Sequence, residues 1–380
     1  MKRIMCMLIL FTTVFLLSVS SSYAFELNGF ADVSFTASVD APEGSLGDES
    51  KNGNFAFGTL DLYLAQSLED IEILAELIVE MGDVLDLERL TLGYTFDDSL
   101  KVRFGRFHTP LGIWNTAYHH GVELQPTINR PEFLNFEDDG GILPVHTIGL
   151  YLSGRIRTGA GAIEYGAMYG NGPAIDVSED EKSNVLIPNN ISDNNTDKAV
   201  GLHASIAPEA VSGLKIGVSG YLSNLENIGL VKDLDGDSTD DLAFDSVDID
   251  QTIIGAALSY SIADVSLMGE YFSIANKDNI APAGADDSFT SSAYYALLTY
   301  SIKDKWIPYI MYENITADDE DPYFVSLGTS DITRVSGGLR YNINYRSSIK
   351  GEIRSNDQED IVKDDTWTWT EYAVQWALAF

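Results

Sequence analysis

The strongest constraint on the fold of this sequence is a period-two alternation of apolar and polar residues, which recurs in sixteen segments. Side chains of a β-strand point alternately to its two faces, so this alternation predicts strands with one apolar and one polar face. The predicted strands cover residues 25–38, 54–67, 71–81, 86–96, 100–107, 145–156, 161–170, 198–207, 214–224, 249–262, 264–274, 290–302, 306–315, 331–343, 346–354 and 366–380.

The connections between these segments alternate between short and long. Seven are tight turns, at 69–70, 97–99, 158–160, 209–213, 264, 303–305 and 344–345. Eight are loops, at 39–53, 82–85, 108–144, 171–197, 225–248, 275–289, 316–330 and 355–365. Turns at one end and loops at the other, with both termini on the turn side, are the layout of an even-stranded antiparallel barrel. A soluble β-sandwich also has many short strands, but it does not require this alternation.

The last segment indicates where the apolar faces point. Its alternate residues Tyr372, Val374, Trp376, Leu378 and Phe380 form one apolar, aromatic face. A soluble sheet would bury that face, whereas a barrel in lipid turns it outward. The chain is 45% hydrophobic, yet beyond its beginning no apolar run reaches the roughly 18 residues of a spanning helix. The fold class is therefore all-β, a transmembrane antiparallel β-barrel of about 16 strands, and its last strand resembles the closing strand of bacterial outer-membrane barrels.

The beginning of the chain reads as a secretory signal. Lys2 and Arg3 precede the apolar stretch 4–19, and small residues up to Ala24 follow it. The stretch is short and ends in small polar residues, which favours a signal peptide over a membrane-anchor helix. We predict a signal peptide at 1–24 and a barrel at 25–380. The single cysteine, Cys6, lies in the predicted signal peptide, so the mature chain has no disulfide or thiol chemistry.

The faces opposite the apolar ones carry many charges, which implies water inside the barrel. Sixteen strands leave an aqueous channel, whereas about eight are filled by side chains. The predicted basic residues of the pore wall are Arg89, Lys101, Arg103, Arg155, Arg334, Arg340, Arg346, Lys350 and Arg354.

The third outer loop, 108–144, is much longer than a connection requires. It contains the aromatic residues Trp114, Tyr118, Phe133 and Phe136 and several prolines, so we expect it to fold into the lumen as a packed, semi-rigid segment. Its charged residues, predicted to line a constriction, are Glu123, Arg130, Glu132, Glu137, Asp138 and Asp139. These acids would create a transverse field with the basic wall. Alternatively, the charges pair and hold the loop in place.

Residues 25–380 resemble the 16-stranded porins of bacterial outer membranes, in which the third loop folds inward. Segment 102–112, Val-Arg-Phe-Gly-Arg-Phe-His-Thr-Pro-Leu-Gly, further resembles a strand-to-loop junction of the phosphate-selective porin O and P family. Those porins select phosphate with lysines and arginines, whereas Arg130 is the only fixed positive charge in this third loop. The resemblance also implies a homotrimer, although the second loop, which commonly latches onto a neighbour, is brief here.

The expected function is an outer-membrane porin for passive diffusion of small hydrophilic solutes or ions, with a modest cation preference. The expected surroundings are outer-membrane lipid and lipopolysaccharide. The alternatives are an anion- or phosphate-selective porin, or an adhesin or receptor barrel that uses acidic surface loops. We do not expect an enzyme, because no Gly-x-Ser-x-Gly elbow or comparable pattern is present.

Two further features concern charge and metals. The formal net charge of −35 argues against nucleic-acid binding, which depends on Lys and Arg. The carboxylates Asp233, Asp235, Asp237 and Asp241 suit calcium, although an acidic surface loop is the alternative. No cofactor is required. For the histidines around the third loop, ordinary hydrogen bonding is preferred to a transition-metal site.

Overall fold

The computed structural model of the protein describes residues 26–79, 85–118, 121–135, 141–178, 183–187, 196–227, 231–232, 242–243, 247–360 and 365–380. Three predictions lie outside these residues. They are the signal peptide at 1–24, the acidic residues Glu137, Asp138 and Asp139 of the third loop, and the calcium ligands Asp233, Asp235, Asp237 and Asp241.

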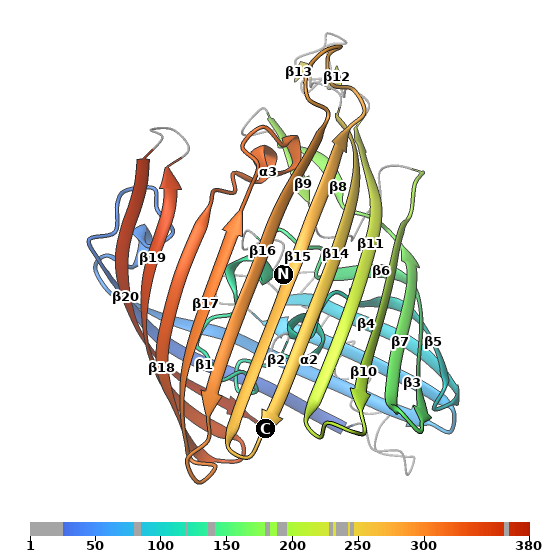
Figure 1. Cartoon of the computed structure of the whole chain (residues 1–380), viewed down its shortest axis with the longest axis vertical. Helices are drawn as coiled ribbons and strands as arrows, with labels where there is room; N and C mark the ends of the chain where they lie inside the picture. The colour runs from blue at the N-terminus through green and yellow to red at the C-terminus, as the bar shows by residue number, and fades with distance from the viewer. Residues whose placement is uncertain are drawn as a thin grey trace, which may run out of the picture.

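Sixteen antiparallel strands form a closed barrel (Figure 1). In order around the barrel they are β1 (Glu26–Val39), β2 (Asn54–Leu68), β3 (Ile71–Val79), β4 (Leu85–Asp97), β5 (Leu100–His108), β6 (His146–Thr158), β7 (Gly161–Gly170), β10 (Ala199–Pro208), β11 (Leu214–Asn227), β14 (Val247–Ile262), β15 (Val265–Asp278), β16 (Ser288–Tyr300), β17 (Trp306–Thr316), β18 (Ile332–Asn344), β19 (Ser347–Asp360) and β20 (Asp365–Ala379). The predicted strands are confirmed. The largest difference is in β19, which continues to Asp360.

The first and last strands close the barrel. β1 and β20 pair from Phe30 opposite Ala379 to Val39 opposite Thr370. Two hydrogen bonds of 3.0 Å between the backbones of Gly29 and Phe380 extend the ladder. Closure satisfies the backbone groups that an open sheet would leave unpaired at its edges.

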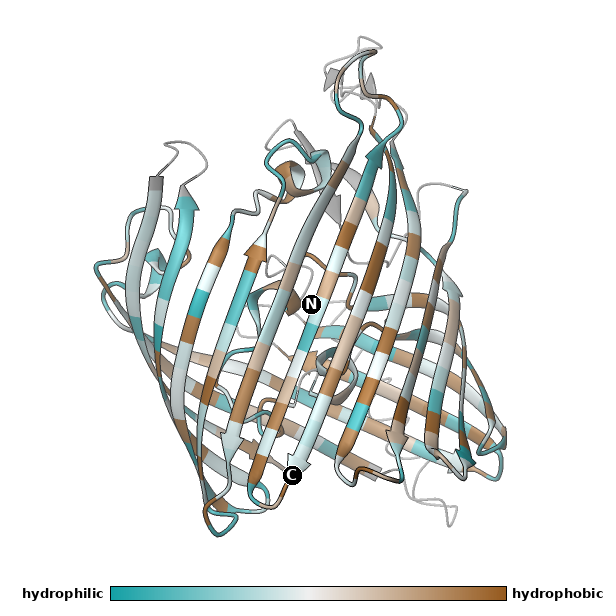
Figure 2. Cartoon of the chain, viewed as in Figure 1, coloured by the Kyte–Doolittle hydropathy of each residue, from teal (hydrophilic) through white to brown (hydrophobic). Residues whose placement is uncertain are grey.

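The outer face of the barrel is apolar and the inner face is largely polar. The predicted lipid-facing residues Leu90, Leu92, Tyr94 and Phe96 of β4 are all exposed. Bands of hydrophobic and hydrophilic residues alternate along the strands in Figure 2. Since alternate residues of one strand point to opposite sides, the exposed apolar set fixes which residues face the lumen.

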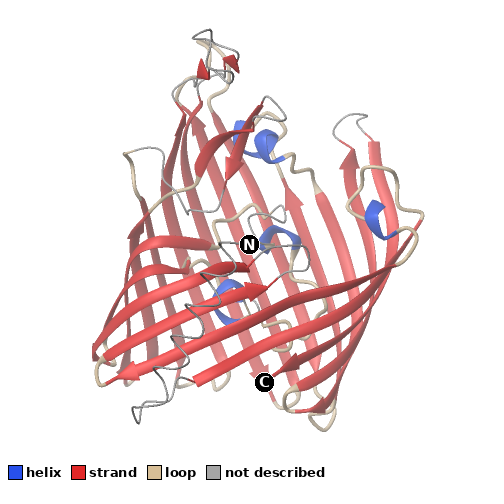
Figure 3. Cartoon of the chain, turned by 180° about the vertical axis from the view of Figure 1, so that it is seen from behind, coloured by secondary structure: helices blue, strands red, loops and turns tan. Residues whose placement is uncertain are grey.

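The remaining elements lie in the connections (Figure 3). They are two small two-stranded sheets, β8 (Ala174–Ser178) with β9 (Ser183–Ile187) and β12 (Val231–Lys232) with β13 (Leu242–Ala243), and the short helices η1 (Asp48–Ser50), α2 (Trp114–Ala117), η2 (Glu132–Leu134) and α3 (Pro322–Leu327). Within the described residues, no helix is both long enough and apolar enough to span a membrane.

Candidate functional site

The third loop lies inside the barrel, with α2 enclosed by the strands (Figure 1). Trp114 and Phe133 are both 0% exposed. Trp114 meets Tyr295 of β16 edge to face, with 5.4 Å between ring centroids, and Phe133 meets Phe272 of β15 at 5.8 Å. The inner face of β15 and β16 is thus apolar where the loop rests on it. Aromatic packing of this kind removes a large apolar area from water.

A buried carboxylate fixes the start of α2. Glu270 of β15 accepts hydrogen bonds from the backbone N–H groups of Ile113 (2.6 Å) and Trp114 (2.7 Å) and from the Tyr295 hydroxyl (2.8 Å). Gly112, at φ +72°, permits this approach, because a Cβ there would lie 1.9 Å from a Glu270 carboxylate oxygen. The final glycine of segment 102–112 therefore has a structural role in seating the loop.

The predicted constriction residue Glu132 is held by the opposite wall. Its carboxylate pairs with Arg334 of β18 at 2.9 Å, and the same guanidinium nitrogen pairs with Glu313 of β17 at 3.0 Å. Glu313 also accepts a hydrogen bond from the backbone N–H of Glu132, at 2.8 Å. One arginine and one wall carboxylate thus anchor η2 from both its side chain and its backbone.

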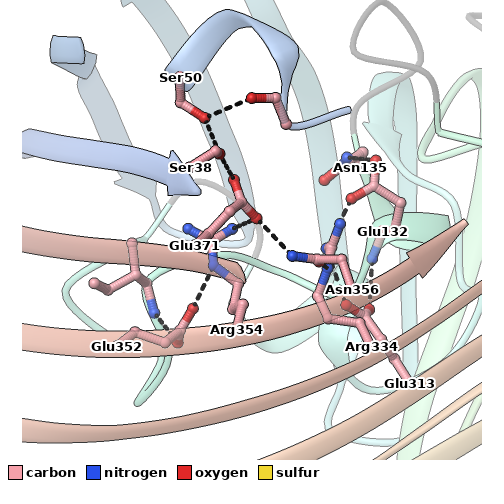
Figure 4. Close-up of polar contacts among 12 residues, drawn as sticks. Ser38, Ser50, Glu132, Asn135, Glu313, Arg334, Glu352, Arg354, Asn356 and Glu371 are labelled. Carbon is pink, nitrogen blue, oxygen red and sulfur yellow. Dashed lines mark hydrogen bonds and ion pairs between the residues drawn. The ribbon is translucent and has the colours of Figure 1, made fainter. Parts of the chain in front are cut away.

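These contacts continue into a network across β18, β19 and β20 (Figure 4). Arg334 donates to Asn356 (2.5 Å), and Asn356 donates to Glu371 (3.2 Å). Arg354 pairs with Glu352 at 3.1 Å and with Glu371 at 3.6 Å. Positive and negative charges therefore alternate in this wall. Each buried charge has a partner of opposite sign, which offsets the cost of removing it from water.

Glu123, another predicted constriction residue, is held in the same way. Arg340 of β18 pairs with its carboxylate at 2.7 Å and also donates to the Gln125 carbonyl at 2.9 Å. The Ser348 hydroxyl donates to the other carboxylate oxygen. Lys350 of β19, which is 0% exposed, donates to backbone carbonyls of the loop, including that of Thr127 at 2.9 Å.

Six predicted site residues therefore come together, but beneath the loop and not around open water. They are Glu123, Glu132, Arg334, Arg340, Lys350 and Arg354. The sequence left two interpretations open, a transverse field across a constriction or paired charges that hold the loop in place. The contacts of these residues support paired charges that hold the loop. Arg130 is also buried within the loop. Arg346 was predicted to lie on the pore wall in a strand, but it lies in the turn before β19.

The predicted basic residues of the opposite wall have a different environment. Lys101 and Arg103 of β5 share Glu72 at 2.9 and 3.3 Å, and Arg155 of β6 lies 3.7 Å from Glu164. Their side chains are 31%, 28% and 48% exposed.

Two further lumen-side cations differ from this group. Arg89 of β4 is less exposed and pairs with Glu76. Lys215 of β11, which was not among the predicted residues, pairs with Glu164 at 2.5 Å. The alternation of segment 214–224 places Lys215 on the inward face, so the sequence could have identified it as a pore-wall residue.

Two loop residues have shifted pKa values. Burial raises the pKa of Tyr118, and the nearby Arg340 opposes that shift. Burial also raises the pKa of Asp321, whose carboxylate caps α3 by accepting from Tyr323 N (2.9 Å) and also accepts from Asn276 (2.8 Å). Tyr323 in turn donates to the Ile142 carbonyl at 2.8 Å, so α3 ties the seventh outer loop to the third.

Metal-binding geometry is not found in the described part of the chain, where no group of three His, Cys, Asp or Glu side chains could hold an ion. His108 and His146 meet at the loop-side ends of β5 and β6, with 5.5 Å between ring centroids. His119 and His120 lie outside the described residues.

A closed barrel with its third loop packed inside is the fold of the bacterial porins, and comparison with solved structures supports this class. OmpT of Vibrio cholerae aligns with a TM-score of 0.58 at 12% identity, covering 95% of this chain and 99% of that one. An anion-selective porin from Comamonas acidovorans aligns with a TM-score of 0.59 at 13% identity, covering 94% and 100%.

A third similar structure is the outer-membrane channel DcaP of Acinetobacter baumannii, with a TM-score of 0.57 at 11% identity, covering 96% of this chain and 99% of that one. No protein-family profile matches the chain. No curated protein matches it either. At these identities the comparisons establish the fold alone.

Proposed function

We propose that the protein is a porin of the bacterial outer membrane, a water-filled channel for passive diffusion of small hydrophilic solutes. The observation that carries the proposal is the asymmetry of the lumen. The third loop is fastened to the inner face of β15–β19, while half-exposed charged side chains remain on β5, β6 and β11. Charges that stay hydrated at a barrel wall are what an aqueous pathway requires.

The structural neighbours agree with this reading. They include an anion-selective porin and an outer membrane channel. The exposed apolar belt of the barrel suits lipid, and membrane strands cannot leave backbone groups unpaired, which closure avoids. One form of OmpT of Vibrio cholerae is a trimer, and we propose that this chain also forms a trimer. Contact with lipopolysaccharide is part of the same proposal.

The charges favour anions over the cation preference that the sequence suggested. Among the described acids of the third loop, Glu123 and Glu132 are engaged by Arg340 and Arg334. The cations of the opposite wall are more exposed. Phosphate selectivity rests only on the resemblance of segment 102–112, in which Gly105 and Gly112 take positive φ angles that suit glycine.

The direct test is electrical. Residues 25–380 would be refolded, inserted into planar bilayers and studied for single-channel conductance. We expect discrete conductance steps in potassium chloride. Under a salt gradient, the reversal potential should have the sign of a weakly chloride-selective channel. A barrel that is folded by circular dichroism and shows no steps would overturn the porin proposal and favour a receptor or adhesin. An enzyme is not proposed.

A further inference from the structure

We propose that the inner face of β5, β6, β7, β10 and β11 binds small multivalent oxyanions, solutes that carry two or more carboxylate or phosphate groups. The inference rests on the channel function proposed above, because the surface faces the lumen. It adds a solute class and a location to that function.

The site is built from four cations on the lumen side of three strands of this wall, with β7 and β10 between β6 and β11. Lys101 and Arg103 belong to β5, Arg155 to β6 and Lys215 to β11. On these strands the residues of the other parity, such as Phe104, Leu152 and Val218, are large, apolar and exposed outward. Alternation along a strand therefore places the four cations inside.

The cations outnumber the carboxylates that neutralise them. Glu72 is shared by Lys101 (2.9 Å) and Arg103 (3.3 Å). Glu164 is shared by Lys215 (2.5 Å) and Arg155 (3.7 Å). Each group of two cations and one carboxylate keeps one positive charge, so this set of six side chains carries +2. All four cations stay 28–48% exposed and can reach a solute.

The two groups form one surface. Lys101 is paired with Ser153 of β6, and Arg155 is two residues further along that strand. Diagonal neighbours of this kind lie about 7–8 Å apart, within reach of long side chains. Arg103 also donates to the Ser153 hydroxyl, at 3.2 Å. A monovalent anion can meet one group, whereas a solute with separated anionic groups can meet both, which favours multivalent anions.

A glycine on β7 lets two polar side chains lie over the wall between these cations. Gly166 of β7 pairs with Ser153 on one side and with His203 of β10 on the other. A Cβ at Gly166 would lie 2.5 Å from the Tyr151 hydroxyl and 2.8 Å from His203 Nδ1. That imidazole nitrogen has no hydrogen-bond partner within the described part of the chain. Gly166 therefore makes room for the Tyr151 and His203 side chains, which lie over its backbone on the lumen face.

Charge-assisted hydrogen bonds are the strong contacts available to such a solute, and arginine presents them in a planar fork that matches carboxylate and phosphate. The site thus works against the overall charge of the protein, which is −35. It would concentrate multivalent anions at the turn-side half of the channel, where Lys101, Arg155 and Lys215 follow or precede the tight turns by a few residues.

The test is block of the chloride current in planar bilayers by citrate or by pyrophosphate, added to both sides, with acetate as the monovalent comparison. The informative variant is Lys101→Gln/Arg155→Gln, because it leaves each carboxylate with one cation and so preserves local pairing. We expect block by citrate, pyrophosphate or both in the unmodified channel, and a blocking concentration about tenfold higher or more in the variant. Which of the two anions blocks more strongly tells whether carboxylate or phosphate is preferred.

Two further variants make the test specific. Arg346→Gln removes an exposed turn cation outside the site, and it should leave the block unchanged. Gly166→Ala keeps every charge but displaces the Tyr151 and His203 side chains that lie over the glycine, and it should weaken the block. Open channels without block, or with equal block in all variants, would overturn the inference while leaving the porin proposal intact. Absence of channels from a folded barrel would overturn both.

Discussion

The two sides of the lumen use the same residue types for different purposes. On β15–β19, Arg334 and Lys350 are buried and Arg340 is only 11% exposed, and all three are bonded to side chains or carbonyls of the third loop. On β5–β11, Lys101 and Arg155 are partly exposed and share their carboxylates with other cations. Burial decides the role, because a desolvated charge must be paired, whereas a hydrated charge can remain available to a solute.

This contrast teaches that the number of basic residues in a barrel lumen does not measure the charge that a solute meets. The buried wall contributes rigidity, since each cation there is fixed by several oxygen atoms. The exposed wall contributes the field. Mutations on the two walls should therefore change different properties, namely the docking of the loop on one wall and the ion selectivity on the other.

The largest effect is expected from Arg334→Met. Removing one partner of a buried ion pair leaves Glu313 and Glu132 without their cation and costs about 3–5 kcal/mol. We expect the docking of the third loop to weaken by that order, with faster proteolysis within the loop and noisier channel currents. Arg103→Met is the matched control on the exposed wall. Equal proteolysis of both variants would show that the two walls do not differ.

A smaller loss is expected from Glu270→Gln. The neutral amide replaces a carboxylate that accepts from Ile113, Trp114 and Tyr295. Buried donors left with poorer partners cost about 1–3 kcal/mol. Hydrogen exchange at the start of α2 should quicken by the corresponding factor, while exchange in β5 and β6 stays the same. Unchanged exchange at Ile113 and Trp114 would mean that Glu270 does not anchor the loop.

A still smaller effect on stability is expected from Lys101→Gln. An exposed ion pair contributes about 0–1 kcal/mol, so unfolding in denaturant should hardly change. The reversal potential under a salt gradient should instead move toward cation selectivity, because one lumen charge is lost. Loss of stability without a shift of the reversal potential would assign Lys101 to the same class as Arg334.

Much of the fold could be predicted because strand alternation is local. It identified the sixteen strands, the outward face of Leu90 and Leu92, and the lumen side of Arg334 and Arg340. It did not identify pairing, since the partners Arg340 and Glu123 are 217 residues apart and meet only through the path of the third loop. The alternation of segment 214–224 also places Lys215 on the lumen side, although its contact with Glu164 depends on strand register.

Water should follow the β5–β11 wall and be excluded from the part of the β15–β19 wall that the third loop covers. Cysteine substitution tests it directly, because residues 25–380 contain no natural thiol. Ser153 of β6 is half-buried beside Lys101, whereas Ser336 of β18 is buried. In an open channel, a charged thiol reagent should lower the conductance of Ser153→Cys and leave that of Ser336→Cys unchanged. A conductance drop in Ser336→Cys alone would place the water pathway on the β15–β19 wall, the opposite of the expected result.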